Sequence, residues 1–138
     1  MGKLLVLYLC LGLLNLAVLA ESTSPPTTKK RTTKEDFAPL DITPFSTVGD
    51  IDPKLVAFRA FAKFSTPQPE GLKSESISVS YSTGKAVVTH TVTGSTDAAV
   101  SAWKYRLEMS LVNGKWKLTW AGKQQKCRKD NKWTKGSC

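Results

Sequence analysis

The sequence predicts an α+β domain: one N-terminal helix packed on a four-stranded antiparallel sheet, a meander followed by a C-terminal disulfide loop. Three observations support this fold class. A helix-start signal at Asp52-Pro53 precedes apolar residues at helical spacing. The segments after it alternate apolar and polar residues, and an Asn-Gly pair joins the last two of them.

The helix is expected to begin at Asp52-Pro53, because Asp can cap free backbone amides and Pro at the first helical position loses no needed donor. Ile51 and Val56 have the spacing of a hydrophobic staple, in which a residue before the cap packs on the first turn. The expected apolar face consists of Leu55, Phe58, Phe61 and Ala62. The helix should end near Phe64.

Strand-like runs follow the helix, with turn residues between them. Residues 76–81 alternate apolar side chains with serines, and residues 86–93 follow after a short turn. One side of that second run carries Ala86, Val88, His90 and Val92. The last two strands flank Asn113-Gly114, a strong hairpin signal because both central residues of a type I′ turn need positive φ.

A two-residue turn fixes the register of the last hairpin, so its opposed residues can be assigned from the sequence. The apolar face is expected to pair Leu111 with Trp116, Met109 with Leu118, and Leu107 with Trp120. The other face is expected to pair Ser110 with Lys117, Glu108 with Thr119, Arg106 with Ala121, and Lys104 with Lys123. The three tryptophans Trp103, Trp116 and Trp120 are therefore expected in the core under the helix.

The chain divides into three parts. Residues 1–20 have an early cation, an apolar run and the ending Val18–Ala20, which together indicate a cleaved export signal. Residues 21–44 are rich in Ser, Thr, Pro and Lys and are expected to form a disordered leader. Residues 45–138 are expected to form a single α+β domain. The protein should therefore be secreted, either extracellular or, in a bacterium, periplasmic.

Cleavage of the signal would remove Cys10 and leave Cys127 and Cys138. Two cysteines in an exported chain most often pair, because the compartment is oxidising and a small domain gains stability from a cross-link. Metal binding is the alternative, but a single histidine and the lack of a Cys-x-x-Cys pair argue against it. The sequence predicts a disulfide, no metal and no cofactor.

The excess positive charge lies in the C-terminal part of the chain. Residues 104–138 hold ten Lys or Arg and two acids, whereas residues 37–103 hold five cations and six acids. The candidate binding residues are Lys104, Arg106, Lys117, Lys123, Lys126, Arg128, Lys129, Lys132, Trp133 and Lys135. A cationic patch with few acids attracts polyanions through its long-range field. The alternative is that the lysines only protect an exposed sheet edge from aggregation.

The expected partner is a sulfated glycan, a cell-wall polymer or an anionic membrane, with nucleic acid less accessible outside the cell. Trp133 lies among polar residues inside the predicted disulfide loop. It either folds back on the end of the sheet or stays exposed as an anchor for a protein partner. The second interpretation gives an alternative function, a secreted inhibitor or toxin-like protein that acts through the Cys127–Cys138 loop.

One helix followed by a four-strand meander resembles the cystatin-like and nuclear-transport-factor-two-like folds. The ending also resembles small exported bacterial domains of the second group; it runs from Trp116 to Trp120, then Ala121-Gly122-x-Gln124-x-x-Cys127, Trp133 and Cys138. The resemblance implies a curved sheet around the helix and, as another alternative function, a small pocket protein or enzyme. The protease-binding hairpins of cystatins are absent, since residues 91–94 keep only the Val and Gly of Gln-x-Val-x-Gly and no Pro-Trp occurs.

Catalysis has little support in the sequence. His90 is the sole histidine, it shares its strand face with valines, and no acid is close to it in sequence. A histidine in such a position is expected to be a structural core residue. The main hypothesis is a secreted, non-enzymatic binding module that uses its basic hairpin face and disulfide loop to engage an anionic partner.

Overall fold

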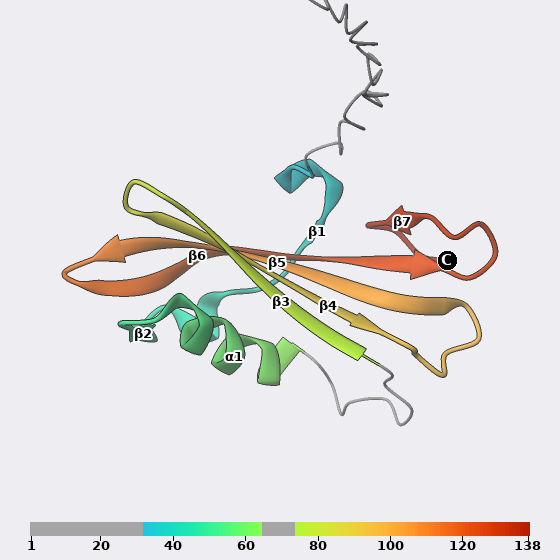
Figure 1. Ribbon diagram of the computed structural model, residues 1–138, viewed down its shortest axis with the longest axis horizontal. Helices are drawn as coiled ribbons and strands as arrows, with labels where there is room; N and C mark the ends of the chain where they lie inside the picture. Colours follow the sequence, from blue (N-terminus) through green and yellow to red (C-terminus); the bar gives the residue numbers. More distant parts are fainter. Residues whose placement is uncertain (1–31, 65–73) are drawn as a thin grey trace, which may run out of the picture. The chain divides into compact units, whose positions relative to one another are not determined.

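The computed structural model describes residues 32–64 and 74–138 as one α+β unit with a helix and an antiparallel sheet (Figure 1). The elements in chain order are η1 (Lys34–Asp36), β1 (Ala38–Pro39), η2 (Thr43–Phe45), β2 (Gly49–Asp50), α1 (Pro53–Phe64), β3 (Ser74–Ser82), β4 (Lys85–Thr93), β5 (Val100–Val112), β6 (Lys115–Cys127) and β7 (Trp133–Thr134). The predicted export signal and residues 21–31 of the predicted leader lie outside the described residues.

The sheet contains more strands than predicted. Strands β3, β4, β5 and β6 form the expected antiparallel meander. The short strands β2, β1 and β7 all pair with the other edge of β6, so seven strands are described in place of four. A two-residue strand is too short to show a periodic pattern, which is why the sequence did not reveal these three.

Helix α1 has the predicted bounds, and Asp52 caps it by accepting a hydrogen bond from the backbone N–H of Lys54 at 2.8 Å. Its buried face differs from the prediction. The residues that face the sheet are Val56, Ala57, Ala60 and Phe61, whereas Leu55, Phe58 and Ala62 are exposed. The two alanines let the helix lie close to the strands, and this places the larger Leu55 and Phe58 outside the contact. Ile51 is exposed as well, so the predicted staple is wrong.

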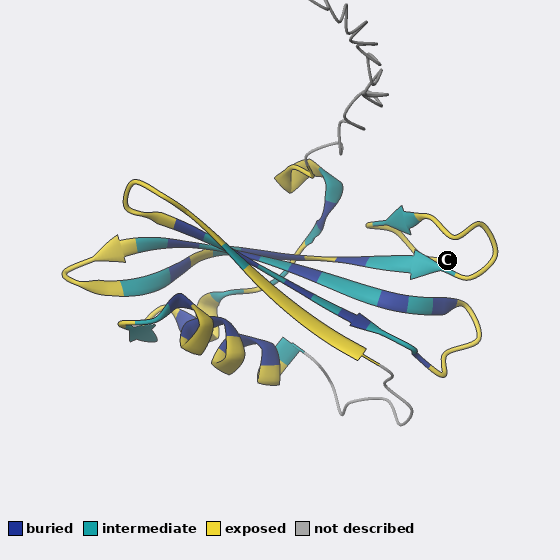
Figure 2. Cartoon of the chain, in the orientation of Figure 1, coloured by how far each residue is buried: buried dark blue, intermediate teal, exposed yellow. Residues whose placement is uncertain are grey.

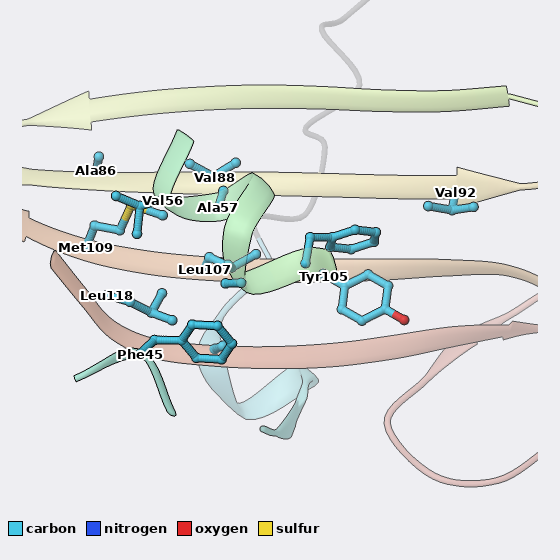
Figure 3. Packing of buried hydrophobic residues seen from close by; sticks show 13 residues of the cluster. Phe45, Val56, Ala57, Ala86, Val88, Val92, Tyr105, Leu107, Met109 and Leu118 are labelled. Carbon is cyan, nitrogen blue, oxygen red and sulfur yellow. The ribbon is translucent and has the colours of Figure 1, made fainter. Parts of the chain in front are cut away.

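The core lies between α1 and one face of the long strands, as predicted (Figure 3). Val56 of α1 meets Val88 of β4 and Leu107 and Met109 of β5, and all four side chains are completely buried. The predicted inward side of β4 is buried at Ala86, Val88, His90 and Val92. Trp103 and Trp116 pack against this core from its edges, which confirms their predicted side of the sheet.

The hairpin between β5 and β6 turns at Asn113 and Gly114, whose φ angles are 50° and 72°. The predicted register holds from the turn to Met109 opposite Leu118. A β-bulge at Thr119 then inserts one extra residue into β6. The observed pairs beyond it are Glu108 with Trp120, Leu107 with Ala121, Arg106 with Gly122, Tyr105 with Lys123, and Lys104 with Gln124. The predicted pairs beyond Met109 are therefore wrong.

The bulge moves Trp120 to the face of the sheet away from α1. An extra residue reverses the in–out order of every later position in the strand, so buried Ala121 takes the core position opposite Leu107. Lys123 is shifted to the other face, the one that faces α1, where it lies opposite Tyr105. The sequence prediction put Trp120 in the core and Lys123 on the basic face, and both assignments are wrong for this reason.

Trp120 has a partner from the N-terminal segment. Phe37 is only 3% exposed and its ring makes an edge-to-face contact with Trp120, with the ring centres 6.3 Å apart. Strand β1 continues this contact into the sheet by pairing with β6, and η1 lies on the side opposite α1 (Figure 1). Residues 32–44 therefore belong to the domain, although the sequence placed them in a disordered leader that ended at residue 44.

Candidate functional site

The predicted disulfide closes a loop at the C-terminal end of the chain. Cys127 and Cys138 are bonded, with their Cα atoms 5.4 Å apart. The bond closes the loop that carries β7, and β7 pairs with the end of β6. The loop is thus joined to the sheet at two places, by the disulfide and by the pairing of β7 with β6.

Two lysines and a tryptophan meet at this end of β5 and β6. The Nζ atom of Lys104 lies 3.9 Å from the centre of the Trp133 ring, and Trp133 is paired with Lys126 between β6 and β7. Burial lowers the pKa of Lys104, and the nearby charge of Lys126 lowers it further. Because the two ammonium groups repel each other, an anion bound between them would relieve this repulsion.

In the part of the chain that the structure describes, no carboxylate lies within ion-pair distance of Lys104 or Lys126. Lys129 and Lys132 are exposed in the adjoining disulfide loop. The carboxylate of Asp130, between them in sequence, accepts the backbone N–H of Lys132 at 3.1 Å. The name basic end is used below for the set Lys104, Lys126, Lys129, Lys132 and Trp133.

Arg106 was predicted to join this surface, but its guanidinium is already engaged by the fold. Its guanidinium donates to Glu108 at 3.0 Å and to the backbone oxygen of Thr32 at 3.1 Å. Lys34 pairs with the same carboxylate at 2.9 Å. Burial raises the pKa of Glu108, and the hydrogen bonds from Lys34 and Arg106 more than offset this, so its pKa lies below the ordinary value. This network ties residues 32–34 to the sheet.

Arg128 also has a structural task. It donates to the backbone oxygens of Ser95 and Asp97, the latter at 2.8 Å, and so joins the end of β6 to the loop before β5. The Asp97 carboxylate accepts the N–H groups of Ala99 and Val100 in that loop, and these hydrogen bonds lower its pKa. The guanidinium of Arg128 is therefore engaged by the fold.

The three remaining predicted lysines are Lys117, Lys123 and Lys135, and none of them takes part in the Lys104–Trp133 contact. Lys117 is opposite Ser110 near the hairpin turn, about 30 Å along β6 from Lys126 at the usual rise of a strand. Lys123 and Lys135 line a polar hollow of about 210 Å³ at the edge of β6, and the Lys135 ammonium donates to the backbone oxygen of Glu35 at 3.0 Å. The structure thus brings Lys104, Lys126 and Trp133 together, with Lys129 and Lys132 in the adjoining loop, whereas Arg106, Arg128 and Lys135 are engaged by hydrogen bonds to other parts of the fold.

Trp133 is half-buried and folds back on the end of the sheet, where the Lys104 side chain covers its ring. Of the two positions that the sequence left open, this is the folded-back one. It gives no support to an exposed Trp133 anchor, on which an inhibitor or toxin-like function of the loop would depend.

A second site lies on the opposite side of the sheet, between α1 and strands β3 and β4. A cavity of about 160 Å³ is lined by Ala57, Phe58, Phe61, Ala62, Ile77, Val88 and Leu107 and by two polar residues, Glu75 and His90. The Nε2 atom of buried His90 contacts the Glu75 carboxylate. The Phe61 ring lies on the imidazole, with ring centres 3.8 Å apart.

Sequence reasoning missed Glu75 as the partner of His90. The sequence contained the information needed to find it, because the turn after β3 sets the register of the β3–β4 hairpin. That register puts Ile77 opposite His90. Glu75 is the next residue on the same side of the same strand, within diagonal reach. Burial lowers the pKa of His90, and Glu75 raises it only in part, so the imidazole is neutral near pH 7.

The buried neutral histidine predicts a loss of stability in weak acid. Below the ordinary histidine pKa of about 6.5 the unfolded chain takes up a proton that folded His90 resists, so the free energy of unfolding should fall as the pH falls. Urea unfolding at pH 7 and pH 5 measures this fall. A His90→Gln variant should show a smaller fall between the two pH values, and an equal fall in both proteins would contradict the assignment.

No family model, curated protein or solved structure matches the chain. The resemblance to cystatin-like and nuclear-transport-factor-two-like domains therefore stays a prediction, as does secretion. Residues 32–64 and 74–138 hold no group of three or more His, Cys, Asp or Glu side chains placed to bind a metal ion. No helix within those ranges has the length and apolar character needed to cross a bilayer.

Proposed function

We propose that the protein is a secreted, non-enzymatic binding module whose basic end engages an anionic polymer outside the cell. The observation that carries the proposal is the meeting of Lys104 and Lys126 beside Trp133, with no described carboxylate close enough to neutralise either lysine. Two exposed lysines of the disulfide loop, Lys129 and Lys132, enlarge this positively charged surface. A surface that only needed to be soluble would not require cations so close that they repel each other.

A polymer fits this site better than a membrane surface does. Proteins that lie on membranes combine cations with apolar side chains that enter the lipid. The large exposed apolar residues in the described ranges are Ile51, Leu55, Phe58, Ile77, Tyr81, Leu111 and Val112. They lie before and on α1, on β3 and at the hairpin tip, away from the basic end. Sulfated glycans and anionic cell-wall polymers need no such apolar group.

Retention on immobilised heparin, used as a sulfated-glycan probe, tests the proposal. Retention should fall steeply with salt, with a log–log slope of about −3 if the four lysines of the basic end contact anionic groups. A matrix of uncharged dextran is the control and should not retain the protein. Retention that is independent of salt would contradict the proposal. Stronger binding to phosphatidylserine vesicles than to heparin would assign the site to membranes.

A second candidate function, a small pocket protein, is favoured by the cavity beside His90. Its volume of about 160 Å³ is close to the roughly 150 Å³ of an apolar cavity that admits one benzene ring. The His90–Glu75 pair would supply a polar contact for such a ligand. Phenol should shift the NMR signals of His90 and Phe61. An Ala62→Leu variant, which fills the cavity from the exposed side of α1, should weaken this shift; no shift in the unsubstituted protein would remove the candidate.

A further inference from the structure

The two edges of the sheet differ in how they are covered. Along the free side of β6, three short strands pair in succession, β2 near the hairpin turn, then β1, then β7 at the far end. On the other side of the sheet, β3 pairs with β4 through nine consecutive residue pairs. Within the described residues nothing pairs with the outer edge of β3, and the strand is exposed along almost its whole length (Figure 2).

Strand β3 lacks the features by which proteins keep such an edge from pairing. Ser74–Ser82 contains no lysine, arginine, proline or glycine, and its ladder with β4 is free of bulges. Exposed edges normally carry a charge, a proline or a bulge, because a row of free N–H and C=O groups otherwise recruits another strand. Glu75 is the single charge in this strand.

The strand is complementary to itself. Antiparallel pairing with a copy about Ser78 sets Ser74 against Ser82, Glu75 against Tyr81, Ser76 against Ser80, and Ile77 against Val79. Serine meets serine, apolar meets apolar, and the carboxylate of Glu75 does not meet its own copy. Opposed side chains of like character stabilise a sheet, whereas like charges directly opposite destabilise it. A foreign strand would need to match this pattern by chance.

The apolar side of the same edge is also uncovered. Ile77 is 49% exposed and Tyr81 is 61% exposed. Phe58 of α1, which lines the same cavity as Ile77, is 69% exposed. A two-fold axis perpendicular to the sheet keeps both helices on one side, so these side chains of the two copies would cover one another. Burial of this apolar surface would stabilise the dimer, in addition to the roughly eight to ten main-chain hydrogen bonds that the paired strands would form.

We propose that a second copy of this chain pairs with β3, so that two sheets join into one continuous sheet about a two-fold axis at Ser78. The proposal does not depend on the anionic ligand. Sedimentation equilibrium of the purified protein should give twice the chain mass, with a dissociation constant in the micromolar range or tighter. A mass equal to one chain at every concentration would overturn the proposal.

Ser78→Lys tests where the copies meet. Ser78 is exposed, so the change should leave the monomer folded, but on the axis the two new ammonium groups would face each other directly. The dissociation constant is expected to rise by about 100-fold or more, which corresponds to a loss of about 2.8 kcal/mol of binding free energy. Ser46→Lys adds the same charge at an exposed serine outside β3 and should leave the dimer intact. Equal effects of the two variants would place the interface elsewhere.

Hydrogen exchange on the unsubstituted protein gives a readout that needs no variant. Successive amides of an edge strand alternate between pointing at the neighbouring strand and pointing outward. In the proposed dimer both sets of β3 amides are protected from exchange. Dilution, which dissociates the dimer, should speed the exchange of the outward-pointing amides only. Fast exchange of every second amide at high protein concentration would overturn the proposal.

Discussion

Replacing Lys104 and Lys126 together by glutamate is expected to weaken binding to heparin by at least about 100-fold at physiological salt, because like charges placed against each other cost several kcal/mol. The change removes two cations from the most closely packed part of the basic end and puts two anions in their place. The log–log slope of binding against salt should become less steep by about 1.5, half of the slope expected for four contacts. Salt-dependent retention on heparin measures both quantities.

The matched control carries Lys54→Glu and Lys63→Glu on the exposed side of α1, which changes the net charge by the same amount. It should lose far less affinity, since a general field effect is screened over about 8 Å at physiological ionic strength. A third variant, Lys117→Glu with Lys123→Glu, should also retain most of the binding, because neither residue takes part in the Lys104–Trp133 contact. Equal losses in all three variants would show that net charge alone governs retention.

Replacing Phe37 by alanine is expected to lower the free energy of unfolding by about 3–4 kcal/mol, the usual effect of emptying a buried phenylalanine site. Phe37 packs on the Trp120 ring above Gly122. A Cβ at Gly122 would lie 2.5 Å from the Trp120 ring and 2.9 Å from the Phe37 Cβ, so the three residues fit closely. Urea unfolding followed by tryptophan fluorescence measures the change.

Ile51→Ala is the control for this prediction. Ile51 is 78% exposed, so its truncation should change the free energy of unfolding by no more than about 0.5 kcal/mol. A disordered leader up to residue 44 would make Phe37→Ala equally neutral. The two variants together therefore test whether the domain begins before residue 37 or at residue 45.

Local sequence signals determined several elements correctly. Asp52-Pro53 marked the start of α1 because capping and the fixed φ of proline act within one turn. Asn113-Gly114 marked the hairpin because positive φ at two adjacent residues favours these side chains. The first pairs after that turn, the inward side of β4 and the disulfide partners also followed from the sequence.

The candidate site could be predicted only in part. The sequence identified a group of C-terminal cations as candidates, but it did not show which of them the fold already uses. Arg106 and Arg128 are bound to groups distant in sequence, at Thr32 and at Ser95 and Asp97. Such contacts form between segments that meet only in the folded chain, and no spacing rule relates them.

The sequence by itself determined where the helix and the long strands lie and which hairpin corner joins the last two strands, because these depend on residues within a few positions of one another. The tertiary structure decided the bulge at Thr119, the outward position of Trp120 and the docking of Phe37 upon it. One extra residue reverses the side of every later side chain in a strand, and the surface that Phe37 covers exists only after the sheet has formed.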